Sequence, residues 1–166
     1  DRDQAKTFIY AFMYGAGASK IGKIVGKGAK EGQILIDRFL SNMPTLKRVR
    51  DSVTETAKRG KIKGIDGRLL YVRSPHSALN TLLQGAGAVV CKLWLINMNK
   101  RIVQTGVDAK LVASIHDEYQ YEVAKKDVKR FGSITKDAMK DTEHQLKMKC
   151  PLDSEWKEGK TWAETH

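Results

Sequence analysis

Two adjacent carboxylates, Asp117 and Glu118, stand in the segment Ser-Ile-His-Asp-Glu at residues 114–118. Apolar or aromatic side chains alternate on both sides of this pair, at Leu111, Ala113 and Ile115 before it and at Tyr119, Tyr121 and Val123 after it. The alternation predicts a hairpin over 110–124 with the two acids at its tip. Because Mg²⁺ prefers oxygen ligands and usually takes one or two protein carboxylates, the pair is a candidate half of a metal site. Adjacent acids in a turn are more often ordinary solvated residues than metal ligands, so the choice between these two interpretations depends on the rest of the chain.

A second candidate group recurs every four residues near the start of the chain, at Arg2, Lys6, Tyr10 and Tyr14. We expect a helix over 1–14, with Asp1 or Asp3 as its N-cap. The expected buried side consists of Phe8, Ile9, Phe12 and Met13. Since four residues advance a helix by about 40° beyond a full turn, the group forms one stripe opposite that side. The stripe is either an ordinary exposed face or an anion site, with cations for a polyphosphate and aromatics for a sugar or base.

A third group, His76, Asn80 and Gln84, also steps by four within an expected helix over 75–104 that Pro75 opens and that ends near Gly106. The apolar side of this helix consists of Leu79, Leu82, Leu83, Ala86, Val89, Val90, Leu93 and Ile96. Such a polar row is more often a buried network or plain surface than a ligand contact. The alternative is contact with the minor-groove edge of base pairs, which would sense pairing geometry without reading sequence.

The elements that must position these groups follow from the spacing of apolar residues. We expect helices within 28–59 joined near Pro44, a hairpin over 61–73, a helix over 125–147 and a last extended strand within 150–166. Asp66-Gly67 favours a type I′ turn in the first hairpin. Short turns are expected at Gly15, Gly17 and Gly22. Helices combined with hairpins indicate an α+β fold with an antiparallel sheet.

Composition narrows the class of partner. The 166 residues include 30 Lys or Arg against 19 Asp or Glu, for a formal net charge of +11. Such an excess favours polyanions, with nucleic acid or nucleotides first. Cys91 and Cys150 match no zinc spacing and suggest a reduced protein. The segment 86–98 is interrupted by Lys92 and is too short to span a bilayer, so we expect a soluble protein of one domain or parts of one, without a membrane partner.

Taken together, the three groups resemble motifs of one family. Arg2-x-x-x-Lys6-x-x-x-Tyr10-x-x-x-Tyr14-Gly15 resembles the fingers-helix motif of family A (DNA polymerase I-like) DNA polymerases. Residues 114–118 resemble their palm motif with its His-Asp-Glu core, and residues 76–85 resemble their primer-template segment. The amino-acid sequences of residues 63–68 and 73–80 are most similar to those of the replicative polymerases of short-tailed, T-odd-type bacteriophages. The resemblance implies helical fingers over 1–60 and, over 61–166, the rest of the fingers and a palm sheet packed on helices, as in part of a right-hand polymerase fold.

The resemblance also implies a role for each residue. Arg2 and Lys6 would grip the incoming dNTP triphosphate, and Lys6 would protonate the leaving pyrophosphate. Tyr10 would pack on the nucleotide sugar, where Tyr implies weak discrimination against a missing 3′-hydroxyl, and Tyr14 would lie beside the templating base. Asp117 would hold two Mg²⁺ ions, with Glu118 as a secondary carboxylate. The primer terminus and minor groove would be lined by His76, Asn80, Gln84 and His116.

The family's other metal-binding Asp lies in an upstream palm strand of the form Asp-x-Ser-x-x-Glu, and this sequence begins after it, at Asp1 and without a Met. We therefore expect that the chain alone cannot polymerise and that an upstream segment or subunit supplies the thumb and first palm motif. Either the sequence is an excerpt of a longer polymerase, or the enzyme is split and this is its C-terminal subunit. A phage protein of this kind would work in the cytoplasm of its bacterial host. The rival interpretations are a non-catalytic DNA-binding module and a Mg²⁺-dependent nuclease that uses Asp117 and Glu118.

Overall fold

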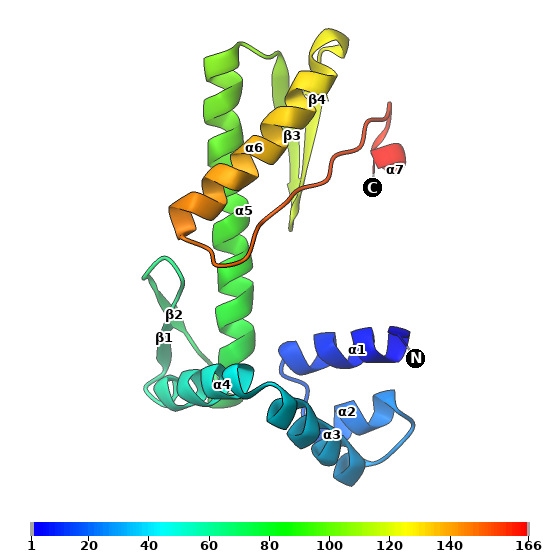
Figure 1. Cartoon of the computed structure of the whole chain (residues 1–166), viewed down its shortest axis with the longest axis vertical. Helices are drawn as coiled ribbons and strands as arrows, with labels where there is room; N and C mark the ends of the chain where they lie inside the picture. Colours follow the sequence, from blue (N-terminus) through cyan, green and yellow to red (C-terminus); the bar gives the residue numbers. More distant parts are fainter. Residues whose placement is uncertain (1, 166) are drawn as a thin grey trace. The chain divides into compact units, whose positions relative to one another are not determined.

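The computed structural model describes residues 2–165, which divide between Gly85 and Ala86 into two compact units. The first unit begins with four helices, α1 Arg2–Met13, α2 Ala18–Ile24, α3 Ala29–Asn42 and α4 Pro44–Ala57 (Figure 1). Its largest buried cluster consists of Phe12, Ile21, Ile36, Leu40 and Leu79. The amphipathic pattern of 1–14 is confirmed except at Ile9, which is exposed because it lies between the buried Phe12 face and the polar stripe. Asp1 lies outside the described residues, and Asp3 lies in the first turn of α1.

The helix α2 was not expected, because its glycine suggested a turn. Gly22 lies inside α2 and is buried, and a Cβ at this position would clash with the backbone carbonyl of Gly28. A Cβ at Gly32 in α3 would likewise clash with the carbonyl of Ala18. Both glycines therefore allow the backbones of two short helices to approach closely, which a residue-by-residue assessment of helix propensity does not capture.

The first hairpin is confirmed, but its turn type is not. Strands β1 Lys61–Lys63 and β2 Leu69–Tyr71 pair antiparallel, with Ile62 opposite Leu70. A type I′ turn needs positive φ at both central residues, whereas only Gly67, at φ 87°, has it here. The loop is longer because the Asp66 carboxylate accepts the backbone N–H of Arg68 at 3.3 Å and its Nε at 2.5 Å. These bonds lower the Asp66 pKa although desolvation alone would raise it.

The long helix is confirmed as a short 3₁₀ turn, η1 Pro75–Ser77, followed by α5 Ala78–Thr105, which ends at Gly106 with φ 66°. One continuous apolar side was expected, but Leu83 and Ile96 are exposed. The reason is that α5 contributes to separate clusters: Leu79 belongs to a cluster of the first unit, and Trp94 and Met98 to one of the second.

By length and composition alone, Pro75–Thr105 could cross a membrane, which the expectation based on 86–98 overlooked. Its polar contacts are nevertheless those of a helix packed against protein. Asn97 is buried and donates from Nδ2 to Thr142 Oγ1 at 3.0 Å. Arg101 forms a two-pronged ion pair with Asp141.

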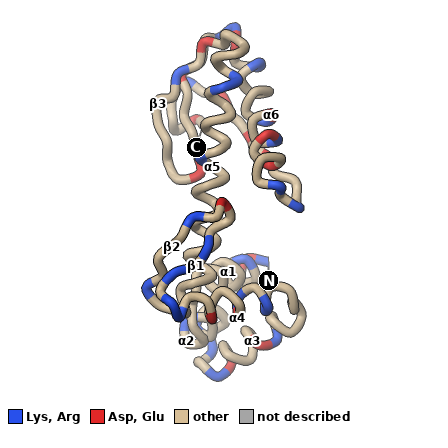
Figure 2. Tube along the Cα trace, turned by 90° about the vertical axis from the view of Figure 1, so that its left-hand side faces the viewer, with Lys and Arg blue, Asp and Glu red and all other residues tan. Residues whose placement is uncertain are grey.

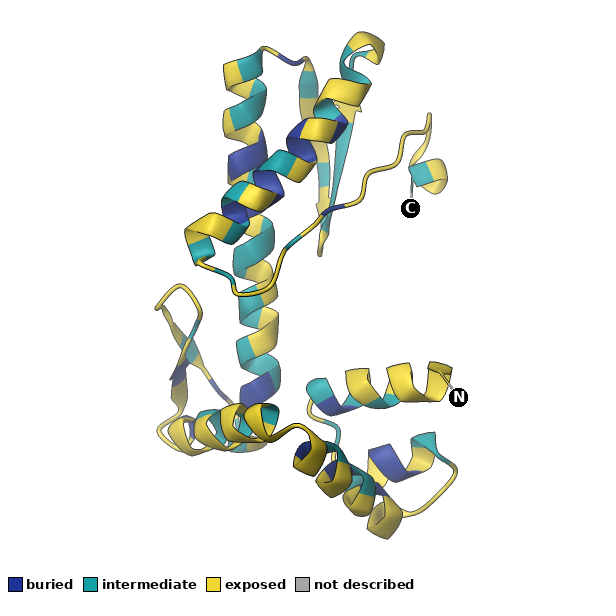
Figure 3. Ribbon diagram, in the orientation of Figure 1, coloured by how far each residue is buried: buried dark blue, intermediate teal, exposed yellow. Residues whose placement is uncertain are grey.

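The second unit contains strands β3 Ala109–Ile115 and β4 Glu118–Val123, the short turn η2 Lys125–Asp127, and helices α6 Val128–Leu146 and α7 Trp162–Thr165. The hairpin is antiparallel, with an irregularity between Leu111 and Ala113 that interrupts the expected alternation and leaves Leu111 exposed. Tyr119 and Tyr121 pack against a cluster built on Trp94, Met98, Ala138 and Met139. Figure 3 shows buried positions on the two helices that supply this cluster, α5 and α6.

The expected last strand is wrong. Residues 150–160 form no strand and lead into α7. The apolar residues of this tail do not alternate with a period of two, so no ladder is favoured. Individual side chains hold the tail instead: Leu152 packs on the Trp94 cluster, and the Trp156 ring occupies the space beside Gly132. The α+β class is confirmed by the helices and the two antiparallel hairpins. The expected domain boundary between 60 and 61 stays a prediction.

Candidate functional site

The acidic pair lies at the tip of a tight hairpin, as predicted. Ile115 pairs with Glu118, so His116 and Asp117 form a two-residue connection between β3 and β4. His116 has φ 52°, a left-handed conformation that two-residue hairpins require and that histidine tolerates better than most residues. Asp117 is exposed, and no other described residue engages its carboxylate in a hydrogen bond or ion pair. The tip therefore presents one carboxylate to solvent.

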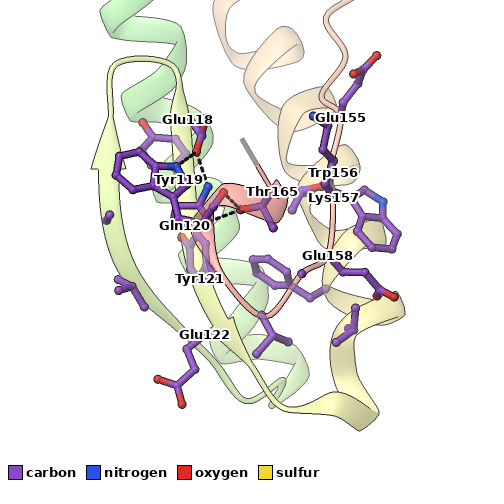
Figure 4. Close-up of a pocket in the computed structure, with 18 of the residues that line it drawn as sticks. Glu118, Tyr119, Gln120, Tyr121, Glu122, Glu155, Trp156, Lys157, Glu158 and Thr165 are labelled. Carbon is purple, nitrogen blue, oxygen red and sulfur yellow. Dashed lines mark hydrogen bonds between the residues drawn. The ribbon is translucent and has the colours of Figure 1, made fainter.

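Glu118, by contrast, is held by other side chains. Its Oε1 accepts a hydrogen bond from Trp162 Nε1 at 3.1 Å and another from the Gln120 amide. Gln120 Oε1 in turn accepts from Thr165 Oγ1 at 3.1 Å (Figure 4). The helix α7 is thus tied to β4 beside the candidate metal ligand. Sequence reasoning missed Gln120, Trp162 and Thr165.

Aromatic contacts hold the hairpin on the helices behind it. The rings of Tyr119 and Trp94 lie 5.2 Å apart, and those of Tyr121 and Phe131 lie 4.8 Å apart. Burial, with a smaller contribution from Tyr119, raises the pKa of Tyr121 to about 12. Burial and then the charge of Asp117 raise the pKa of the Cys91 thiol, so α5 at Cys91 lies within electrostatic range of the tip.

A cavity of about 850 Å³ extends from the hairpin tip between β4, α6 and residues 155–162 (Figure 4). Tyr121, Phe131 and Trp156 form part of its wall, and Asp117 and Glu118 lie at its edge. Its lining therefore combines aromatic surface with carboxylates.

The predicted stripe is present within the first unit as an exposed row on α1, with Tyr14 in the turn that follows the helix. Lys6 Nζ lies 5.9 Å from the centroid of the Tyr10 ring, and the Tyr10 and Tyr14 rings are 6.4 Å apart with an interplanar angle of 18°. Arg2, at the start of the helix, is also exposed. Such a row offers cations followed by two aromatic faces.

The polar row of the long helix is less uniform than expected. His76 lies in η1 and is exposed, Gln84 is exposed, and Asn80 is half-buried. Among the described residues, no donor reaches the buried Asn80 Oδ1. A buried acceptor without a partner is costly, so Asn80 is the member of the row that most needs a further contact. The acidic tip and this row belong to different units of the chain.

The sequence profile of DNA polymerase family A matches residues 1–164. The chain belongs to this family. All three motifs lie within the matched residues, and the role of each motif residue stays a prediction.

Three phage proteins named "DNA-directed DNA polymerase" are similar to 99% of this chain. Those of Enterobacteria phage T3, Escherichia phage T7 and Escherichia phage Phieco32 are 42%, 41% and 44% identical to it. The chain spans only 27%, 27% and 28% of their respective lengths. A solved structure, the "POL domain of Pol1 from M. smegmatis complex with DNA primer-template and dNTP", matches with a TM-score of 0.77 and 20% identity. It covers 85% of this chain and 27% of that chain, and supports the fold.

Family A DNA polymerases use divalent metal ions, generally Mg²⁺. The exposed Asp117 carboxylate suits this hard cation. Glu118 suits it less, because the two donors on Oε1 compete with direct coordination through that oxygen. Within residues 2–165, no three His, Cys, Asp or Glu side chains are grouped so that they could hold a metal ion.

Proposed function

We propose that this chain forms the fingers and palm part of a template-directed DNA polymerase, which adds dNTPs to a primer 3′ end by nucleotidyl transfer. The observation that carries the proposal is the family match over 1–164 together with an exposed, unengaged Asp117 at a hairpin tip. The phage relatives bear the same activity in their names, although the chain covers about a quarter of each.

In this proposal Asp117 would hold two Mg²⁺ ions together with a second Asp from an upstream polymerase segment or subunit outside these 166 residues. Glu118, which other side chains hold by hydrogen bonds, would serve as a secondary carboxylate. When bound, the ions would supply stabilisation of the attacking and departing oxygens of phosphoryl transfer. The hydrogen bonds of Glu118 to Trp162 and Gln120 suit an orienting role better than a primary one.

The stripe on α1 acts on the nucleotide. Arg2 and Lys6 neutralise negative charge on the triphosphate, and Lys6 donates a proton to the departing pyrophosphate. Tyr10 packs on the sugar and Tyr14 lies beside the templating base. The stacked arrangement of the two rings supports these roles, since it leaves flat apolar surface beside the cations.

The polar row contacts primer-template DNA. His76, Asn80 and Gln84 lie along the minor groove, and His116 lies near the primer terminus. The orphaned Asn80 Oδ1 supports a contact from outside the described chain. We propose that the polymerase acts in the cytoplasm of a bacterial host, since the relatives named above come from phages.

The test is primer extension by the chain mixed with a polypeptide that carries the thumb and first palm motif of a phage relative. Asp117→Ala should abolish extension, while Glu122→Ala, which removes an exposed acid from β4, should not. Lys6→Ala should reduce extension strongly, and Lys20→Ala should not. Activity that survives Asp117→Ala favours a non-catalytic DNA-binding module. Mg²⁺-dependent DNA cleavage that is indifferent to Lys6→Ala favours a nuclease. Extension by the chain alone contradicts the need for an upstream partner.

A further inference from the structure

The hairpin of the first unit has one buried face and one exposed face. Ile62 is buried in a cluster with Ala57, Val72 and Ala78, and its strand partner Leu70 packs against the same cluster. Side chains alternate along a strand, so the neighbours of Ile62 and Leu70 point the other way. The register pairs Lys61 with Tyr71 and Lys63 with Leu69 on that outer face. These four residues define the outer face of the β1–β2 hairpin.

Tyr71 is unusually open for an aromatic side chain. It is 85% exposed, and Leu69 beside it is 56% exposed. Opposite residues on paired strands have Cβ atoms about 5 Å apart, so Lys61 and Tyr71 are cross-strand neighbours. In the described part of the chain, neither Lys61 nor Lys63 forms an ion pair. The face therefore offers a ligand an exposed ring and two lysines that form no ion pair with any described residue.

The hairpin that carries this face is rich in Lys and Arg positions (Figure 2). Residues 59–73 contain five Lys or Arg and a single acid, Asp66, which Arg68 already engages. Proteins that bind single-stranded nucleic acid combine cations along the phosphates with aromatic rings on which unpaired bases stack. A base in a duplex has both faces covered by its neighbours and cannot use such a ring.

We propose that the outer face of the β1–β2 hairpin binds single-stranded DNA, with Tyr71 stacking on a base and Lys61 and Lys63 contacting the neighbouring phosphates. The source of the strand rests on the proposed function, in which it is unpaired template. Binding itself requires neither Mg²⁺ nor dNTP. An acidic protein segment would use the same lysines but would gain little from the Tyr71 ring, which is why we favour nucleic acid.

The test is fluorescence anisotropy of a labelled oligo-dT of about a dozen nucleotides with the 166-residue chain, without metal or dNTP. Tyr71→Ala should raise Kd at least about five-fold, because base stacking on an aromatic ring is typically worth that much or more. Tyr71→Phe should restore binding, because the ring and not the hydroxyl stacks. Since Tyr71 is exposed, both variants should fold, which circular dichroism checks.

The two lysines have a separate signature. Lys61→Gln with Lys63→Gln should lower the slope of log Kobs against log salt by about 1.4, because each single-strand phosphate contact contributes about 0.7. Lys20→Gln with Lys23→Gln removes the same charge from exposed positions on α2 and should change the slope less.

Three results would overturn the inference: no effect of Tyr71→Ala on Kd, equal effects of the two lysine pairs, or equally tight and Tyr71-dependent binding of a blunt duplex. Competition by a poly-glutamate peptide that needs the lysines but not Tyr71 would point to an acidic protein partner instead. Oligo-dT binding is measured without Mg²⁺ or dNTP, whereas primer extension requires both. Failure of this inference is thus distinguishable from failure of the polymerase assignment, which primer extension reports.

Discussion

Replacing Arg101 with Met should lower the free energy of unfolding, because the Arg101 side chain links α5 to α6. Its Nε lies 2.7 Å from Asp141 Oδ2 and its Nη2 lies 3.0 Å from Asp141 Oδ1. A longer contact of 3.5 Å joins Nη1 to Asp137. The same two helices supply Trp94 and Phe131, on which the hairpin tyrosines pack.

The magnitude follows from geometry and exposure. Exposed ion pairs typically contribute about 0.2–1 kcal/mol, whereas breaking a buried pair costs about 3–5 kcal/mol. The Arg101 side chain is 33% exposed and that of Asp141 39% exposed, so the pair lies nearer the exposed limit. The two-pronged geometry raises its contribution. We therefore expect a coupling free energy of about 1 kcal/mol, in line with hydrogen bonds between charged groups that are partly solvated.

The assay is a double-mutant cycle of Arg101→Met and Asp141→Asn, read by urea denaturation at neutral pH. Arg130→Met serves as a control, because Arg130 is an exposed α6 residue with no ion-pair partner in the described part of the chain. A coupling free energy below about 0.3 kcal/mol, within the usual error of additivity, would refute the assigned role.

The pH dependence provides a second check. Hydrogen bonds from Arg101, and then its charge and nearby cations, lower the pKa of Asp141 below its ordinary value of 3.8 despite partial desolvation. A carboxyl with a lowered folded-state pKa stabilises the fold above its unfolded pKa and loses that contribution as pH falls through the folded pKa. Wild type should therefore lose more stability than Asp141→Asn as pH falls below about 4. Parallel acid-unfolding curves would contradict the mechanism.

Three further changes test the second unit. In wild type the Tyr121 hydroxyl stays protonated in the folded state up to its pKa of about 12, whereas it ionises near 10 in the unfolded state, so the free energy of unfolding falls as pH rises between these values. Tyr121→Phe should remove this loss, and identical circular dichroism unfolding curves for the two proteins over that range would contradict the prediction. Gly132→Ala should displace the Trp156 ring, red-shift its fluorescence and speed proteolysis of the tail; an unaltered spectrum would argue against the packing. Trp162→Phe removes the indole donor to Glu118 and should lower primer extension by the complemented enzyme roughly five-fold, as loss of about 1 kcal/mol implies; unchanged extension would deny it a positioning role.

The features that sequence predicted are those with a local period. The exposed row on α1 follows from four-residue spacing, and the hairpin at Asp117 follows from alternation and a polar tip. The α2 helix could not be predicted this way, because Gly22 is helical only through the close approach of α3. The predicted type I′ turn at Asp66-Gly67 was wrong for another reason. The hydrogen bond from the Arg68 side chain to the Asp66 carboxylate determines the loop, and the turn preferences of a residue pair do not include such a bond.

The candidate site shows the same division. Asp117 and Glu118 were found from the sequence because they adjoin a turn. The bonds from Trp162 and Thr165 to the Glu118–Gln120 pair join residues 44 and 45 positions apart, and the tail that carries them has no period. Only packing brings them together, so the tail was mistaken for a strand.

The alternation of β4 explains how one strand can serve both support and chemistry. The rings of Tyr119 and Tyr121 contact those of Trp94 and Phe131. Burial of these aromatic surfaces holds the strand against the helices. Glu118 and Gln120 alternate with these tyrosines along β4, and they accept hydrogen bonds from the α7 side chains Trp162 and Thr165. Asp117, one residue earlier, is in the connection and escapes both sets of contacts. The hairpin therefore places a restrained carboxylate, Glu118, directly after an available one, Asp117. Under the proposed function this asymmetry assigns Asp117 as the primary metal ligand and Glu118 as the auxiliary acid.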